Sequence, residues 1–120
     1  MDAQIERPPK RVALIDDSLA VRRSLSLLLR ANGFDVIAFE KAEDAIECRP
    51  DVDRVLIDYR LPGTDGIALL RTLRNLGVNA PAILISGVIA PRIDELAKRA
   101  GFASFLRKPM NRADLLDALG

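Results

Sequence analysis

Five side chains that can do chemistry follow short apolar runs in this sequence. They are Asp16, Asp17, Asp58, Ser86 and Lys108. If these groups shared one site, its three carboxylates would repel each other, by about 4 kcal/mol for two unit charges ~4 Å apart at an effective dielectric near 20. Positive charge must therefore share the site, and Lys108 supplies only part of it.

The remaining negative charge predicts a hard divalent cation, and Mg²⁺ is the cofactor that fits. Mg²⁺ is usually bound by one or two carboxylates together with waters and a phosphate. With a metal ion and an ammonium to neutralise a phosphoryl group, one carboxylate can attack phosphorus and form an aspartyl phosphate. In such a site Ser86 would donate a hydrogen bond to a phosphoryl oxygen.

These side chains meet only if the segments before them end at the same edge of one sheet. Short runs of Val, Ile and Leu alternate along the chain with longer segments of helical spacing, which is typical of a parallel sheet covered by helices on both faces. The predicted strands are residues 12–15, 36–39, 55–57, 82–85 and 104–106. Ligands bind such sheets beyond the carboxyl ends of the strands, where the five side chains stand.

Helical segments are predicted between and after these strands. They are residues 18–31, 42–48, 66–76, about 91–100 and 111–119. In the first, apolar residues recur at helical spacing from Val21, and Asn32-Gly33 favours an end to the helix. Asp65 is the expected N-cap of the third helix, and Pro91 suits the first position of the fourth. We therefore predict an α/β fold, with a doubly wound five-stranded parallel sheet flanked by five helices.

Length and composition limit the class of protein. A chain of 120 residues has room for one domain. The sequence contains no His and only one Cys, which excludes a histidine phosphocarrier and a structural zinc site within it. The lone Cys48 cannot form an internal disulfide, so we expect a reducing, cytoplasmic location. A net charge of +1 without a dense basic block argues against direct binding of nucleic acid.

The extent of the domain and its relation to membranes are also predicted from the sequence pattern. Residues 1–10 combine a Pro pair with mixed charges and no periodicity, so we expect a flexible N-terminal leader followed by one domain over residues 11–120. Apolar runs stay far below the ~18 residues of a membrane span, so we expect no membrane association.

The ordered set of motifs resembles the receiver domain of the response regulators in bacterial two-component signalling. The motifs are ALIDDS at residues 13–18, LIDYRLPGTDG at 56–66, ISG at 85–87 and KP at 108–109. Each motif is common by itself, but the four in this order, each at a strand end, are specific. The resemblance extends from Arg11 to the C-terminus and implies the flavodoxin-like receiver fold.

The resemblance implies a role for each acidic position. Asp58 is identified as the phosphoacceptor of a phosphoprotein. The Mg²⁺ ligands would be the carboxylates of Asp16, Asp17 and Asp58 and the backbone carbonyl of Arg60.

Further positions match the part of the family that binds and senses the phosphoryl group. Ser86 matches the family's hydroxyl, which is more often Thr, and Lys108 matches its lysine. The peptide bond before Pro109 is typically cis in the family. Phe105 falls on the aromatic position that switches with Ser86 and changes a partner-binding surface.

The resemblance also implies partners. A histidine kinase or a histidine phosphotransfer protein would donate the phosphoryl group. We expect it to dock near the phosphorylation end on an exposed stripe of the first helix that includes Ala20, Ser24 and Leu27. The fourth helix, fifth strand and fifth helix would form a surface for a homodimer or an output partner.

Other function classes compete with this interpretation. A receiver-like interaction scaffold that does not use phosphorylation would have the same fold. An Asp-nucleophile phosphatase of the haloacid dehalogenase type would be an enzyme, but that family has Asp-x-Asp after its first strand, whereas this chain has Asp16-Asp17. A nucleotide-binding flavodoxin-like module needs a phosphate-binding loop there, and two carboxylates would repel phosphate. We therefore expect slow self-modification in signalling and not an enzyme.

Overall fold

One parallel sheet lies at the centre of the computed structural model, which describes residues 10–88 and 91–120. Its strands are β1 (Arg11–Ile15), β2 (Asp35–Phe39), β3 (Arg54–Asp58), β6 (Ala82–Ser86) and β7 (Ser104–Arg107). They lie in the order β2-β1-β3-β6-β7, and every neighbouring pair is parallel. Because the strand order reverses at β1, the carboxyl ends of β1 and β3 border the crevice where such sheets bind ligands.

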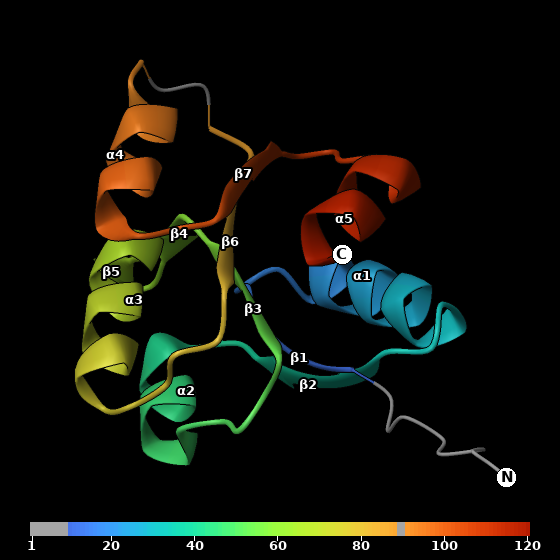
Figure 1. The fold of residues 1–120 in the computed structure, drawn as a ribbon, viewed down its shortest axis with the longest axis horizontal. Coiled ribbons are helices and arrows are strands. Elements are labelled where there is room, and N and C mark those ends of the chain that lie inside the picture. The colour runs from blue at the N-terminus through green and yellow to red at the C-terminus, as the bar shows by residue number, and fades with distance from the viewer. Residues whose placement is uncertain (1–9, 89–90) are drawn as a thin grey trace, which may run out of the picture.

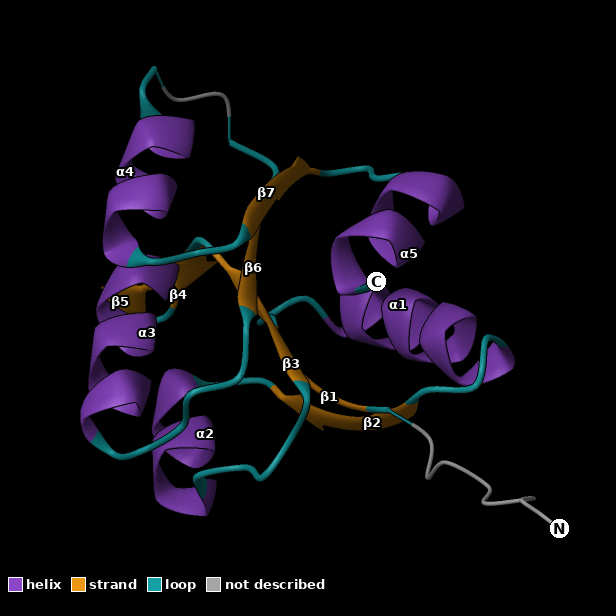
Figure 2. Cartoon of the chain, viewed as in Figure 1, coloured by secondary structure: helices purple, strands orange, loops and turns teal. Residues whose placement is uncertain are grey.

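Helices cover both faces of this sheet within the described residues. On one face lie α1 (Leu19–Ala31) and α5 (Arg112–Leu119); on the other lie α2 (Ala42–Cys48), α3 (Gly66–Asn75) and α4 (Ile93–Ala100) (Figure 1). Figure 2 shows the resulting three layers, with the strands between two groups of helices. The predicted fold class is confirmed. None of the described helices is long and apolar enough to cross a membrane.

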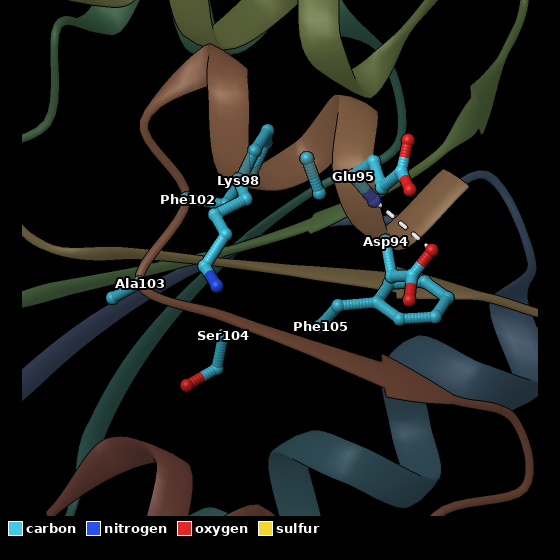
Figure 3. A pocket seen from close by; sticks show the side chains of 8 residues that line it. Asp94, Glu95, Lys98, Phe102, Ala103, Ser104 and Phe105 are labelled. Carbon is cyan, nitrogen blue, oxygen red and sulfur yellow. Dashed lines mark hydrogen bonds between the residues drawn. The ribbon is translucent and has the colours of Figure 1, made fainter. Parts of the chain in front are cut away.

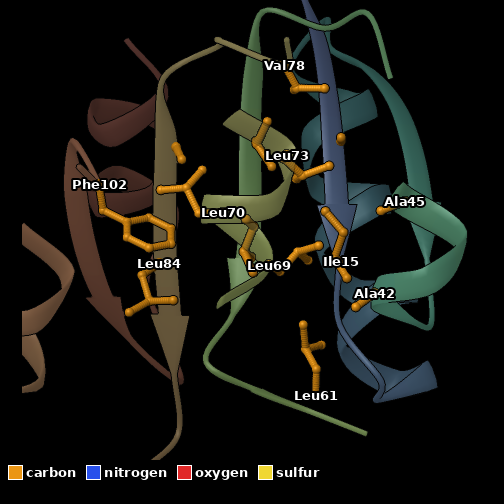
Figure 4. Packing of buried hydrophobic residues seen from close by; sticks show 14 of the residues in the cluster. Ile15, Ala42, Ala45, Leu61, Leu69, Leu70, Leu73, Val78, Leu84 and Phe102 are labelled. Carbon is orange, nitrogen blue, oxygen red and sulfur yellow. The ribbon is translucent and has the colours of Figure 1, made fainter. Parts of the chain in front are cut away.

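Each face of the sheet has its own hydrophobic core, because successive strand side chains point to opposite faces. Figure 4 shows the core beneath α2, α3 and α4, where Leu69, Leu70 and Leu73 pack with Ile15 and Leu84. The core beneath α1 and α5 includes Leu14, Leu25, Leu29, Leu56, Ile85 and Leu115. Burying one such side chain stabilises the fold by about 1.5–3 kcal/mol. Packing on both faces therefore holds the carboxyl ends of the central strands in fixed relative positions.

Two local features differ from the predictions. The helix α4 begins at Ile93, so the predicted start at Pro91 was wrong. Arg92 precedes the helix with a φ of 70°, and this left-handed conformation cannot continue a right-handed helix. A short hairpin of β4 (Arg60–Leu61) and β5 (Thr64–Asp65) was not predicted, because two-residue strands show no periodicity. The expected leader, residues 1–10, lies outside the described residues except for Lys10.

Candidate functional site

The three predicted carboxylates come together at the carboxyl edge of the sheet. In the ladder between β1 and β3, Ile15 pairs with Ile57, so the residues that follow them, Asp16 and Asp58, lie side by side. One carboxylate oxygen from each of Asp16, Asp17 and Asp58 lies within 4.8 Å of the other two. Asp16 and Asp58 are buried, and Asp17 is exposed. The structure thus joins residues 42 positions apart into one acidic cluster that opens to solvent at Asp17.

Lys108 brings the positive charge that the sequence predicts for this cluster. Its Nζ lies 2.8 Å from Asp16 Oδ2 and 3.3 Å from Asp58 Oδ1, so one ammonium bridges the two buried carboxylates. The backbone amide of Lys108 donates a 2.8 Å hydrogen bond to the carbonyl of Ser86, which anchors the end of β7 to β6. The peptide bond between Lys108 and Pro109 is cis.

The charges of the cluster act on one another. Burial raises the pKa of the Asp58 carboxyl, and the neighbouring charge of Asp16 and, less strongly, that of Asp17 raise it further, while Lys108 partly opposes the shift. Burial by itself would lower the pKa of the Lys108 ammonium. The hydrogen bonds and charges of Asp16 and Asp58 outweigh this effect, so the pKa of Lys108 is raised. The ammonium stays charged and neutralises part of the negative charge of the buried pair, Asp16 and Asp58.

The donor set of the cluster fits a hard divalent cation. Asp16 Oδ2 is fully buried and, apart from the ammonium 2.8 Å away, has no polar partner among the described residues. Three carboxylates with one ammonium leave negative charge uncompensated, and carboxylate oxygens are the ligands that Mg²⁺ takes in proteins. Arg60, whose carbonyl is the fourth predicted ligand, begins β4 two residues after Asp58.

Two residues to which the sequence patterns assigned no role in the site place the acidic groups. The amide of Gly66 donates a 2.7 Å hydrogen bond to Tyr59 O, and a Cβ at this position would stand 2.6 Å from Asp58 O. Only glycine allows α3 to begin so close to the end of β3. On the other side, Arg22 of α1 donates from Nη1 to Asp16 O at 2.7 Å. The single sequence contains no signal for either contact, since both depend on how strands and helices lie in space.

The two predicted switch residues, Ser86 and Phe105, have different surroundings. The hydroxyl of Ser86 is buried; it accepts a 3.0 Å hydrogen bond from the amide of Val88 and donates a 3.3 Å one to its carbonyl. Phe105 is partly buried and lines a pocket of about 250 Å³ between α4 and β7, beside Asp94 and Lys98 (Figure 3). The pairing of β6 with β7 connects the two residues through two neighbouring strands.

The docking stripe predicted on α1 is exposed, but its placement needs a correction. Ala20, Ser24 and Leu27 all face solvent, and 73% of Leu27 is exposed. Leu27 does not stand beside the acidic cluster, because it lies eight residues after Leu19, or about 12 Å along the helix axis at 1.5 Å per residue. The exposed leucine in the first turn of α1 is Leu19, at 51%, which the helical pattern did not single out.

Part of this stripe adjoins the segment that carries the lysine. Ala20 and Ser24 line a hollow of about 360 Å³ whose opposite wall includes Lys108, Pro109 and Met110. The first half of α1 and the start of the β7–α5 loop therefore form one continuous surface next to the cluster.

The chain resembles known proteins in both sequence and structure. The family described as response regulator receiver domain matches residues 12–120. The chain is 36% identical over 110 residues to the transcriptional regulatory protein FixJ of Rhizobium meliloti (strain 1021), covering 90% of this chain and 54% of that protein. It therefore spans about half the length of the curated relatives it matches.

Solved structures agree with the sequence match. The crystal structure of FixJ-N superposes with a TM-score of 0.83 at 34% identity, covering 92% of this chain and 90% of that one. A CheX-CheY-BeF3-Mg²⁺ complex from Borrelia burgdorferi contains a chain that matches with a TM-score of 0.83 at 28% identity, covering 92% and 87%.

The electrostatics of the cluster predict that Asp58→Asn stabilises the protein in the absence of Mg²⁺. Because the folded-state pKa of Asp58 lies above its ordinary value of 3.8, ionising this carboxylate lowers the free energy of unfolding. The penalty is absent well below pH 3.8, grows as pH rises from 3.8 to the folded-state pKa, and is constant above it. Thermal melting in EDTA should therefore show a higher melting temperature for Asp58→Asn at pH 7, with the gain shrinking as pH falls toward 3.8.

The control for this measurement is Asp51→Asn, which removes one exposed carboxylate from the loop between α2 and β3. It should change the melting temperature little at either pH. A lower melting temperature for Asp58→Asn at pH 7 would contradict this prediction and would show that the ion pair with Lys108 outweighs burial and the neighbouring carboxylates.

Proposed function

Because this chain belongs to the response regulator receiver domain family, we propose that it accepts a phosphoryl group on Asp58 from a phosphohistidine, with Mg²⁺ as cofactor. The donor would be a histidine kinase or a histidine phosphotransfer protein in the cytoplasm. The observation that carries this proposal is the cluster itself, in which three carboxylates lie within 4.8 Å and an ammonium stands 3.3 Å from Asp58.

Each residue of the cluster would have its own role in phosphoryl transfer. An oxygen of Asp58 attacks phosphorus, the P–N bond of the phosphohistidine breaks, and the imidazole nitrogen keeps the bonding electron pair. The Lys108 ammonium can stay paired with the negative charge as that charge moves from the Asp58 carboxylate to a phosphoryl oxygen, since Lys108 already contacts Asp58. Asp16, Asp17, Asp58 and the carbonyl of Arg60 would hold Mg²⁺, which supplies charge neutralisation to the phosphoryl oxygens.

This chemistry describes a switch and not a turnover enzyme. Asp58 is consumed once per phosphorylation, and the relative FixJ is a transcriptional regulatory protein. The runner-up is a receiver-like scaffold that does not use phosphorylation. The buried, Lys-bridged pair of Asp16 and Asp58 speaks against it, because burial of charge without a use costs stability. An Asp-nucleophile phosphatase is less well supported, because the nucleophile here follows β3 and not β1.

Mass spectrometry of the intact protein tests the proposal. Incubation with MgCl₂ and acetyl phosphate should add the mass of one phosphoryl group, and EDTA should prevent the addition. Asp58→Asn should remove it, whereas the control Asp53→Asn, an exposed aspartate outside the cluster, should retain it. Absence of the adduct in the wild-type protein, or its persistence in Asp58→Asn, would contradict the assignment.

We further propose that Ser86 couples phosphorylation to a distant surface. A phosphoryl group adds close to two negative charges and strong acceptors, so the Ser86 hydroxyl would turn toward it and give up its bonds to Val88. Val88 lies in the segment that leads from β6 to α4. Phe105 could then move further into the hollow beside α4. These changes would alter the surface of α4, β7 and α5, where an output partner or a second copy of the chain would bind.

Replacing Ser86 by Ala tests this coupling. The variant should still be phosphorylated on Asp58, but phosphorylation should no longer change self-association, measured by analytical ultracentrifugation, or partner affinity. Ser104→Ala, which removes a half-buried hydroxyl from β7, should respond like the wild type. A full response to phosphorylation in Ser86→Ala would mean that the coupling runs through another element.

We also propose that the phosphodonor docks on α1 through a stripe that includes Ala20, Ser24 and Leu27. These residues are exposed, and Ala20 and Ser24 adjoin the Lys108 segment. Leu27 lines a hollow together with Arg22, Arg23 and Arg30, so basic side chains border this end of the stripe. A partner helix that covers Leu27 would therefore need acidic side chains that face these arginines.

The prediction from this surface is that Leu27→Glu slows phosphotransfer from the kinase at least tenfold, because a charge would have to be buried in the complex. Phosphorylation by acetyl phosphate should be unchanged. The control is Leu96→Glu, which places the same charge at an exposed leucine of α4. Equal loss with both donors, or equal loss in the control, would rule out a docking role for Leu27.

A further inference from the structure

The backbone carbonyl of Asp16 has an unusual partner. The strand β1 ends at Ile15, and the amide of Asp16 still donates to Phe39 O of β2 at 3.1 Å. The first helical hydrogen bond of α1 starts only at Ser18, whose carbonyl accepts from the Arg22 amide at 2.9 Å. Between strand and helix, the Asp16 carbonyl accepts a hydrogen bond from the Arg22 guanidinium, with Nη1 at 2.7 Å.

This hydrogen bond fixes the peptide plane between the two metal-site aspartates. The carbonyl of Asp16 belongs to the peptide unit that ends at the nitrogen of Asp17, so holding its oxygen sets the direction in which Asp17 leaves the strand. The Asp16 carboxylate has its own anchor, because the amide of Ser18 donates to its Oδ1 at 2.9 Å. No side-chain hydrogen bond holds the exposed Asp17 among the described residues, so its position depends on this peptide plane.

We infer that Arg22 is a positioning residue for the Mg²⁺ site, holding the Asp16–Asp17 turn so that both carboxylates face the cation. The inference rests on the proposed function. A short hydrogen bond from a charged donor is about twice as strong as one between neutral groups. Groups that orient metal ligands from behind typically change metal affinity by about 10- to 100-fold when they are removed.

The charge of Arg22 and its hydrogen bond are expected to change Mg²⁺ affinity in opposite directions. A guanidinium near a cation site repels Mg²⁺, so its removal would tighten Mg²⁺ binding if charge were its only influence. A positioning role predicts weaker binding. The sign of the change in Mg²⁺ affinity therefore separates the two explanations.

Arg30 offers a matched control on the same helix. Its Nη2 donates to the backbone carbonyl of Val36 in β2 at 3.2 Å, so it also connects α1 to a strand. This contact lies two turns of helix beyond Arg22, away from the acidic cluster. Arg30→Gln removes the same charge and the same type of hydrogen bond without touching the Asp16–Asp17 turn.

The experiment is isothermal titration calorimetry of the unphosphorylated protein with MgCl₂ alone. Arg22→Gln should raise the Kd for Mg²⁺ about tenfold, and Arg30→Gln should change it less than twofold. Arg22→Lys keeps the charge but has a shorter reach and no planar fork, so its Kd should lie between those of the wild type and Arg22→Gln. Melting in EDTA should show similar losses of stability for Arg22→Gln and Arg30→Gln.

Several outcomes would overturn the inference. Unchanged or tighter Mg²⁺ binding by Arg22→Gln would do so, as would an equal weakening in Arg30→Gln. If Arg22→Gln does not fold, Arg22→Lys decides, and wild-type affinity in that variant would refute the need for the guanidinium geometry. A wild-type protein that binds no Mg²⁺ would reject the proposed function as well, whereas the first outcomes reject the role of Arg22 alone.

Discussion

The ammonium of Lys108 is the interaction on which the acidic end of this sheet depends. Two carboxylates that are almost fully buried, Asp16 and Asp58, lie on neighbouring strands, and without a cation between them their repulsion would oppose the packing of β1 against β3. The same lysine is held by the backbone, since its amide donates to Ser86 O. The position of the β7–α5 loop is therefore part of the charge balance of the site.

One ammonium does not fully compensate the negative charge of the site in the folded protein. Burial and two neighbouring carboxylates raise the pKa of Asp58, so the ionised nucleophile is maintained at the expense of stability. The hydrophobic cores on the two faces of the sheet offset this cost, because they are formed by the same strands that end at the cluster. Chemistry and folding are thus linked through strands that are apolar along their length and acidic at their carboxyl ends.

Much of this arrangement could be predicted from the sequence. The apolar runs located all five strands of the main sheet, and four of the five side chains predicted to meet, those of Asp16, Asp17, Asp58 and Lys108, lie together at its carboxyl edge. Asp65 was expected as an N-cap, and its side chain does accept a hydrogen bond from the Ala68 amide. These features are local, since burial on both faces selects Val, Ile and Leu, and helix ends select residues that can satisfy free backbone groups.

What the tertiary structure decided concerns contacts between elements. The hydrogen bond from Arg22 to Asp16 O and the close approach of Gly66 to Asp58 O both depend on how α1 and α3 pack at the ends of β1 and β3. The helix α4 begins later than predicted, because Arg92 adopts a left-handed conformation that the neighbouring residue types did not indicate. A sequence pattern records which side of an element is buried, but the distance between two atoms on different elements is set only when both elements pack against the same core.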